Sequence, residues 1–434
     1  MNIHSQIKSF GSSTLVKNSL VYVITDGINK AIPFILLPFI SRFLTPADYG
    51  IVSNYNVYIQ ILSVFVYLCT AGIIPVMFFK VDHENLKKVI SNMIFINTAA
   101  TIFFLMLSMI EYGYVNNYFS LPLIIQLVGI VSVWFSSITN INLILWRCEE
   151  KPLKFGAYQI SQTLLNAVST VLFVMILLWG WQGRVWSMMI SCILMGFVSI
   201  YILKANDYVA FTIDRKSVKT VLAFSIPLIP HALSFWFKSG TDKILLTSLC
   251  GLTENGLYSV AMTWGAVVSL FLVAYNNSYS PYLYKKLAKF DKDKDGTLKE
   301  QYQLVKVIWI SFVTTLLLVG VIYVVSYYLT VIIYPPSYYG SLEYLAMVMI
   351  SQAFNGAYLL FVCFCHYTLR TKVLGVITFS LSLVQVLLSY LLILSCGSVG
   401  VAYSSAIVSI LTFIFVAIYG MRVYNLPWFN FKLA

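Results

Sequence analysis

Five charged residues lie well inside long apolar segments of this 434-residue sequence: Asp26, Lys30, Lys238, Asp242 and Lys243. Each charge costs about 3 kcal/mol at the centre of a membrane helix, so such residues usually face a partner or a polar cavity. Asp26 and Lys30 are four residues apart, as are Lys238 and Asp242, and this spacing predicts an ion pair on one helix face in each case. Lys243 is then left without a partner in its own helix.

The basic members of this set have two interpretations. If acids and bases only neutralise one another, they hold helices together and bind no ligand. If positive charge is left over, then Lys30, Lys238 and Lys243, with Arg42 just beyond the first apolar segment, form a cationic site. Lysine and arginine both bind phosphate groups, so this second interpretation predicts an anionic ligand.

Three titratable residues could bind a coupling ion in the same region. Asp26 and Asp242 are carboxylates within apolar segments, and His231 follows Pro230. Buried carboxylates and histidines in membrane helices often take up and release protons. We therefore expect these three side chains to be the candidate ion-coupling groups, with packing as the alternative role for His231.

Uncharged polar residues also follow one helix face. Gln159, Gln162 and Asn166 lie at positions i, i+3 and i+7, which share a face of an α-helix. A polar face within an apolar segment predicts either hydrogen bonds between helices or a wet, ligand-binding interior.

Metal and catalytic motifs are incomplete or missing. "DKDKDGTLKE" (291–300) begins like an EF-hand calcium loop, but its twelfth position is Tyr302 where the motif needs glutamate. The sequence contains no GxxxxGK[ST] phosphate loop, no HExxH and no GxSxG. We expect no metal, no cofactor and no catalytic centre, and hence no enzyme.

The composition indicates a membrane protein. The chain is 59% hydrophobic and only 10% charged, against about 25% charged residues in soluble domains. Stretches of about 20 apolar residues are long enough to cross a bilayer. They predict twelve transmembrane helices, at about 19–41, 51–79, 89–110, 119–146, 156–179, 184–203, 220–246, 256–284, 304–333, 342–367, 373–395 and 399–421.

The net charge of +12 is explained by topology rather than by nucleic-acid binding. Of 28 Lys and Arg residues, 23 fall in one set of connections, only Arg42 and Arg184 fall in the other, and three lie inside spans. The positive-inside rule then predicts that both termini are cytoplasmic. Residues 285–306 become the most basic cytoplasmic loop, a candidate contact for anionic membrane lipids.

Two halves of the sequence look alike. "LTPADYGIVS" (44–53) and "GLTENGLYSV" (251–260) share Leu-Thr, an acid, Gly and Ser at similar offsets, and each follows an apolar segment with two prolines. Paired helices broken at matching positions are typical of transporter repeats. We expect an N-terminal six-helix lobe (1–205), a cytoplasmic linker (206–219) and a C-terminal six-helix lobe with a short tail (220–434).

The segments "PFISRFLTPADYGIVS" (38–53) and "SGTDKILLTSLCGLTENGLYSVAMTW" (239–264) resemble the corresponding segments of Wzx-type polysaccharide flippases. The resemblance implies a bacterial inner-membrane protein of the multidrug/oligosaccharidyl-lipid/polysaccharide exporter superfamily, all-α, with two pseudo-symmetric six-helix bundles around a central cavity. It also implies a substrate, an undecaprenyl-diphosphate-linked oligosaccharide for O-antigen or other surface polysaccharide, moved by alternating access. The family's basic cavity residues correspond to Lys30, Arg42, Lys238 and Lys243.

Two alternatives differ from this interpretation. A drug antiporter of the same superfamily would favour cationic substrates, which a basic interior disfavours. A membrane polysaccharide polymerase would resemble proteins with a long, arginine-rich outer loop, and the predicted outer loops here are short. Expected partners are the lipid-linked oligosaccharide, membrane lipids and other membrane proteins of polysaccharide assembly, but no nucleic acid.

Overall fold

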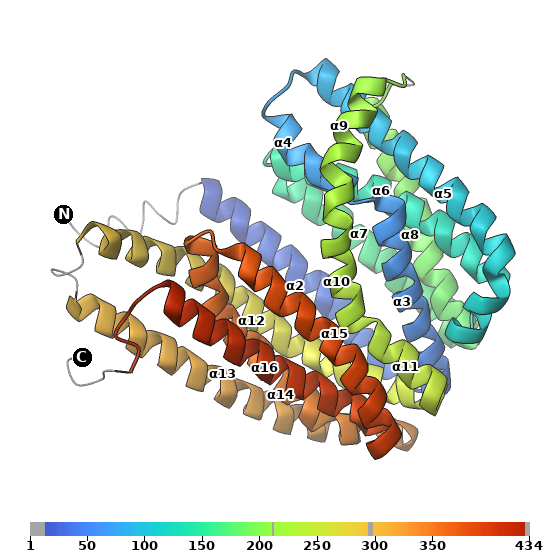
Figure 1. Cartoon of the computed structure of the whole chain (residues 1–434). Coiled ribbons are helices and arrows are strands. Elements are labelled where there is room, and N and C mark those ends of the chain that lie inside the picture. The colour runs from blue at the N-terminus through green and yellow to red at the C-terminus, as the bar shows by residue number, and fades with distance from the viewer. Residues whose placement is uncertain (1–13, 211, 294–297, 430–434) are drawn as a thin grey trace. The chain divides into compact units, whose positions relative to one another are not determined.

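The computed structural model describes residues 14–210, 212–293 and 298–429. All regular secondary structure in this part of the chain is helical (Figure 1). The chain forms two compact units, Met1–Trp236 and Phe237–Ala434.

The first unit runs from blue to green in Figure 1 and holds the helices up to the first part of α10. Its helices are α2 (Thr14–Ile40), α3 (Pro46–Tyr67), α4 (Ile74–Phe78), α5 (His83–Phe119), α6 (Leu123–Cys148), α7 (Pro152–Thr170), α8 (Gly180–Ala205), α9 (Arg215–Ser225) and α10 (Ile229–Ser239).

The second unit runs from green to red in Figure 1 and takes up the end of α10. Its helices are α11 (Thr241–Cys250), α12 (Leu252–Lys292), α13 (Leu298–Ile333), α14 (Ser341–Tyr367), α15 (Thr371–Cys396) and α16 (Gly400–Val423). The helices α12, α13 and α16 all pack against α14. Close approach is possible where glycines replace larger side chains: a Cβ on Gly356 would lie 2.4 Å from a Leu272 methyl group.

The structure confirms an all-α integral membrane fold. In the described residues, eight helices are long and apolar enough to cross a bilayer, or nine if one bent pair counts as a single span. That pair joins α3 to Thr70–Phe78 with a bend of 51°. The expected count of twelve spans therefore stays a prediction.

Local sequence explains where α3 begins. Thr45 is its N-cap and Pro46 is its first residue, which suits a position where no backbone donor is needed. The Thr45 hydroxyl accepts a hydrogen bond from the Asp48 backbone, and the Asp48 carboxylate accepts one from the Thr45 backbone. This reciprocal capping box is encoded by the "TPAD" sequence.

Prolines break one of the two expected helices but not the other. The helix α2 continues through both Pro33 and Pro38, so the predicted break in the first apolar segment is wrong. In the seventh predicted span, Pro227 lies in a 3₁₀ turn (Ile226–Leu228) between α9 and α10. A second break follows at Gly240, between α10 and α11.

The stretch predicted as a linker is bound to α5. The Asp207 carboxylate forms a 2.6 Å ion pair with Lys87, and the backbone amide of Ala210 donates to the Ser91 hydroxyl at 2.8 Å. The Asp214 amide donates to the Asn92 side chain at 3.0 Å. These contacts explain why the boundary between the two compact units falls within α10 rather than within 206–219.

Candidate functional site

A polar stripe on α7 meets α2 in the first unit. Asn29 of α2 donates to the Gln159 side-chain oxygen at 3.0 Å and accepts from the Thr163 hydroxyl at 2.9 Å. Gln159 therefore joins two helices, whereas Asn29 and Thr163 were not identified from the sequence. The three polar residues of α7 do not all face the same helix, because the Gln162 amide donates to the Cys192 sulfur of α8 at 3.9 Å.

The charged residues around Asn29 are exposed on the first unit. Asp26, Lys30 and Arg42 all have exposed side chains. In the described part of the chain no ion pair joins Asp26 to Lys30, so the predicted neutralisation of this pair does not form. The Lys30 charge is consequently available to a ligand.

The most constrained arginine lies at the other end of the α7 stripe. Arg184 donates from Nη1 to the Asn166 side-chain oxygen at 2.7 Å and to the Thr170 hydroxyl at 2.8 Å. Thr170 also shares a 2.8 Å hydrogen bond with Ser187. Arg184 was predicted at the outer end of a span that begins at this residue, and in the structure it is the fifth residue of α8, which begins at Gly180.

A π-helical segment adjoins this cluster. Residues Val171–Ile176 form a π-helix directly after Thr170, and such wide turns frequently mark functional sites. Gly183, next to Arg184, packs tightly against the π-helix. A Cβ at Gly183 would lie 2.8 Å from the Phe173 carbonyl oxygen. The absence of a side chain at Gly183 thus allows α8 to approach the π-helix.

In the second unit, Asp242 lies among donors from two other helices. Its side chain is 2% exposed. It accepts from Gln385 at 2.7 Å, from Ser389 at 2.7 Å and from Ser405 at 3.1 Å. Gln385 and Ser389 belong to α15 and Ser405 to α16, so one carboxylate connects three helices. We call these four residues the Asp242 cluster.

Lys243 follows Asp242 in α11 of the second unit. Lys243 is half-buried beside Asp242, and among the described residues its ammonium group forms no hydrogen bond or ion pair. Lys238 and Asp242 lie on either side of Gly240, where α10 ends and α11 begins, and the ion pair expected between them stays a prediction. The side chains of Lys238 and His231 lie outside the described part of the chain.

The acidic stretch that resembles a calcium loop has other partners. Asp291 accepts hydrogen bonds from the hydroxyls of Tyr367 at 2.6 Å and Tyr424 at 2.8 Å. Glu300 forms ion pairs with Lys286 and Lys289. The remaining residues of the motif, 294–297, lie outside the described residues. Asp291 and Glu300 thus fasten the ends of this loop to neighbouring helices.

The family comparison agrees with the membrane fold. The family described as "Polysaccharide biosynthesis protein" matches residues 15–287, more than half of the chain. The Haemophilus influenzae protein named "Lsg locus putative protein 1" is 26% identical over 367 residues, which cover 83% of this chain and 86% of that protein. An "Uncharacterized membrane protein" of the same organism is 24% identical over 298 residues, covering 66% of this chain and 68% of that one.

Solved structures share the fold at low sequence identity. An inward-facing multidrug resistance MATE family transporter of the MOP superfamily has a TM-score of 0.68 and 16% identity, covering 93% of this chain and 94% of that chain. The lipid II flippase MurJ in an inward closed conformation has a TM-score of 0.67 and 15% identity, covering 92% and 87%. This chain is a multi-pass membrane protein with the fold of these transporters, and it belongs to the polysaccharide biosynthesis protein family.

Proposed function

We propose that this protein moves an undecaprenyl-diphosphate-linked oligosaccharide from the cytoplasmic to the periplasmic leaflet of the bacterial inner membrane. The repeat unit would serve O-antigen, lipopolysaccharide or another surface polysaccharide. The observation that carries the proposal is the environment of Arg184, whose described partners, Asn166 and Thr170, are neutral. A guanidinium held within membrane helices by neutral oxygens keeps its charge for an anionic ligand.

Other basic residues support an anionic substrate. Lys30 and Arg42 are exposed on the first unit, and Lys243 is half-buried in the second. Among the described residues none of the three forms an ion pair with an acidic side chain. A diphosphate carries the negative charge that such side chains bind. The family name and the fold shared with a lipid II flippase are consistent with a lipid-linked saccharide.

Asp242 is our candidate for coupling transport to an ion gradient. A buried carboxylate is costly unless it is hydrogen-bonded or neutralised, and Asp242 is bound by α15 and α16 through hydroxyl and amide groups. Uptake of a proton or a monovalent cation would change the contacts among α11, α15 and α16. Asp26 and His231 remain further candidates on sequence grounds.

The competing proposal is a multidrug antiporter, which the MATE fold also serves. Cationic drugs would be repelled by unpaired Lys and Arg side chains, so the described charges favour the lipid-linked substrate. The two proposals predict different phenotypes, because only the flippase acts on an endogenous lipid-linked sugar.

The decisive experiment deletes the gene in its native host and identifies the lipid-linked sugar of the inner membrane. We expect an undecaprenyl-diphosphate oligosaccharide to accumulate in the cytoplasmic leaflet, and surface polysaccharide to fall, with both restored by the wild-type gene. Increased drug sensitivity with normal surface polysaccharide would contradict the flippase and support the antiporter.

A further inference from the structure

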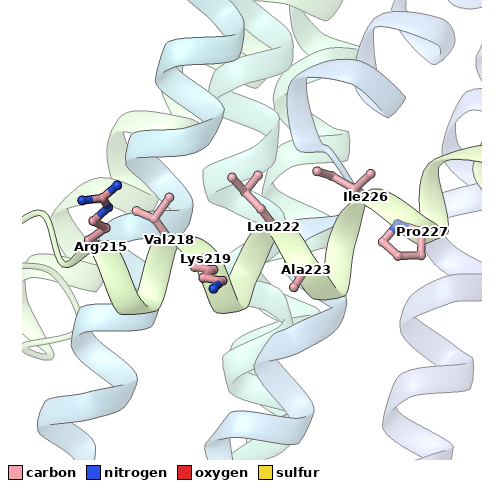
Figure 2. A pocket seen from close by; sticks show the side chains of 7 residues that line it. All are labelled: Arg215, Val218, Lys219, Leu222, Ala223, Ile226 and Pro227. Carbon is pink, nitrogen blue, oxygen red and sulfur yellow. The ribbon is translucent and has the colours of Figure 1, made fainter.

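Two hollows flank α9 on the first unit and share part of their walls. The first has a volume of about 560 Å³ and is lined by Arg215 and Lys219 together with apolar residues of α9 and the following turn (Figure 2). The second has a volume of about 540 Å³ and is lined by apolar side chains of α3, its C-cap Leu68, α5 and α9. Val218 and Leu222 line both hollows, so a basic end leads into an apolar groove.

The helix between the hollows is held firmly in place. The Asp214 carboxylate caps α9 by accepting from the backbone amides of Lys216 and Ser217, and Asn92 of α5 holds the Asp214 amide. Val221 and Ser225 of α9 are fully buried and form the inner face of the helix. The hollows are therefore built into the first unit, which limits the ordering cost of binding a ligand.

The basic end has the chemistry of a phosphate site. Arg215 and Lys219 are one helical turn apart, exposed, and without an acidic partner among the described ion pairs. Figure 2 shows Arg215 at one end of the row that leads to Pro227 and Lys219 one turn further along α9, with the two charged groups on different sides of the ribbon in this view. A guanidinium and an ammonium at this spacing can contact the oxygens of one phosphate group together.

The groove has the shape and surface for a hydrocarbon chain. The rings of Phe65 and Phe104 lie 5.7 Å apart, and both line the groove. Phe95 and Phe103 are 45% and 56% exposed, so the groove is open along its side. Small residues such as Ala99 leave room between these rings. Its volume lies within the range of sites for single small ligands.

We propose that a bilayer phospholipid with an anionic headgroup binds at α9, its phosphate on Arg215 and Lys219 and one acyl chain in the groove beside Phe65 and Phe104. The positive-inside rule predicts α9 on the cytoplasmic side, where anionic lipids attract basic residues. The two basic residues can bind the phosphate of such a headgroup, and the open side of the groove lets one acyl chain enter from the bilayer.

The test uses the full-length protein in nanodiscs with phosphatidylglycerol that carries a photoreactive diazirine in one acyl chain. We expect crosslinks at residues of the groove, and strong competition by unlabelled phosphatidylglycerol but not by phosphatidylcholine. Equal competition by the two lipids would overturn the headgroup assignment. Stronger competition by undecaprenyl diphosphate would overturn the phospholipid assignment.

Charge variants separate the site from general surface charge. The double variant Arg215→Gln/Lys219→Gln is expected to reduce crosslinking about 25-fold, as two basic residues each contribute about five-fold near an anionic lipid. The matched control Lys204→Gln/Lys216→Gln removes the same charge from exposed residues that do not line the hollow, and it should retain crosslinking. An equal loss of crosslinking in the two double variants would show that general surface charge attracts the lipid, and it would contradict a specific site at Arg215 and Lys219.

A third variant tests the groove without altering charge. Ala99→Trp fills the space between the phenylalanine rings and should abolish crosslinks within the groove, while Ala205→Trp, at the exposed end of α8 outside it, should not. Melting curves in detergent verify that each variant is folded. The lipid competition experiment on the wild-type protein tests the headgroup preference independently of any substitution. Unchanged groove crosslinks in a folded Ala99→Trp variant would exclude this groove as the chain site.

Discussion

Arg184 and Asn166 join α8 to α7 through a 2.7 Å hydrogen bond from the guanidinium to the side-chain oxygen. The same nitrogen reaches Thr170 at 2.8 Å, directly before the π-helix Val171–Ile176. Arg184 thus has two roles among these helices. It satisfies polar groups between helices, and it retains a positive charge with no acid among its described partners.

We predict that Arg184→Gln lowers both stability and export. Loss of the guanidinium removes its hydrogen bonds to Asn166 and Thr170, and a hydrogen bond from a charged group contributes about 1.5–3 kcal/mol. Arg184→Lys should recover part of the export, because the charge is kept while the shorter ammonium side chain reaches Asn166 and Thr170 less well. Thermal unfolding of purified protein and surface polysaccharide in a deletion strain are the two measurements. Arg422→Gln, on an exposed residue at the end of α16, is the control for charge removal. Full export by a stable Arg184→Gln protein would exclude this residue from substrate binding.

The sequence predicted local features better than long-range ones. The start of α3 could be predicted because "TPAD" contains its cap, and the break near Pro227 could be predicted because proline removes a backbone donor. The continuity of α2 could not, since proline bends or interrupts a helix depending on which neighbours satisfy the freed carbonyls.

The Asp242 cluster shows the limit of sequence spacing. Its donors are 143 to 163 residues away from the carboxylate in sequence. The i, i+4 rule could only suggest a partner within the same segment, whereas these donors come from α15 and α16. The hydrogen bonds of Arg184 to Asn166 and Thr170 could not be predicted for a related reason, because spacing within one segment does not show which helix packs beside it.

We predict that Lys243→Gln strongly reduces export while leaving the protein in the membrane. The ammonium group has no described partner, so its removal costs little stability but takes charge away from the substrate. Lys243→Arg should retain part of the function, since the charge is kept while its geometry changes. The readout is surface polysaccharide normalised to protein level. Lys285→Gln, on an exposed residue in the C-terminal part of α12, is the matched control. Normal export by Lys243→Gln would assign this lysine to a structural role.

We predict that the attachment of the 206–214 stretch to α5 weakens in acid. The hydrogen bond from Lys87 lowers the pKa of Asp207 below its ordinary value. A carboxyl group whose pKa is lower in the folded than in the unfolded protein stabilises the fold at pH values above its unfolded-state pKa, about 3.9. This contribution is lost as the pH falls through the folded-state pKa. Little change from this group is therefore expected between pH 7 and about pH 5.

Hydrogen exchange of amides 208–210 and 212–214 measures this effect as protection factors corrected for intrinsic rates. In the wild-type protein, protection should fall below about pH 4 toward the level of Asp207→Asn, which should be low at all pH values. Asp214 also has a lowered pKa, through the Ser217 hydroxyl, and contributes in the same window. Identical protection in wild type and Asp207→Asn at pH 7 would show that the ion pair does not hold this stretch.

We predict that residues 285–306 face the cytoplasm and that Cys396 faces the periplasm. The distribution of Lys and Arg gives the orientation, and Cys396 is exposed at the end of α15. Two single-cysteine proteins, one with Cys396 alone and one with Lys292→Cys alone, are labelled in intact cells with a membrane-impermeant thiol reagent. Only Cys396 should react, and both should react after the cells are opened. Labelling of position 292 from outside would reverse the topology.

We predict that Asp242 binds the ion that drives transport. Its carboxylate is buried and connects α11 to α15 and α16 through Gln385, Ser389 and Ser405. A ligand that binds only the folded protein raises its melting temperature as its concentration increases. Purified wild-type protein should therefore melt at a higher temperature in sodium chloride than in choline chloride of equal ionic strength if the ion is sodium. If the ion is a proton, melting should depend on pH but not on sodium.

Two variants separate ion binding from the structural role of the same carboxylate. Asp242→Asn removes the charge but can still accept hydrogen bonds, so it should fold and lose whichever ion response the wild type shows. Ser389→Ala removes one donor and leaves the carboxylate charged. It should lower the free energy of unfolding by about 1 kcal/mol, and with it the melting temperature. The ion response should remain. Export should fail in Asp242→Asn and persist at a reduced level in Ser389→Ala. A folded Asp242→Asn protein with an unchanged ion response would move the coupling site away from this cluster, toward Asp26 or His231.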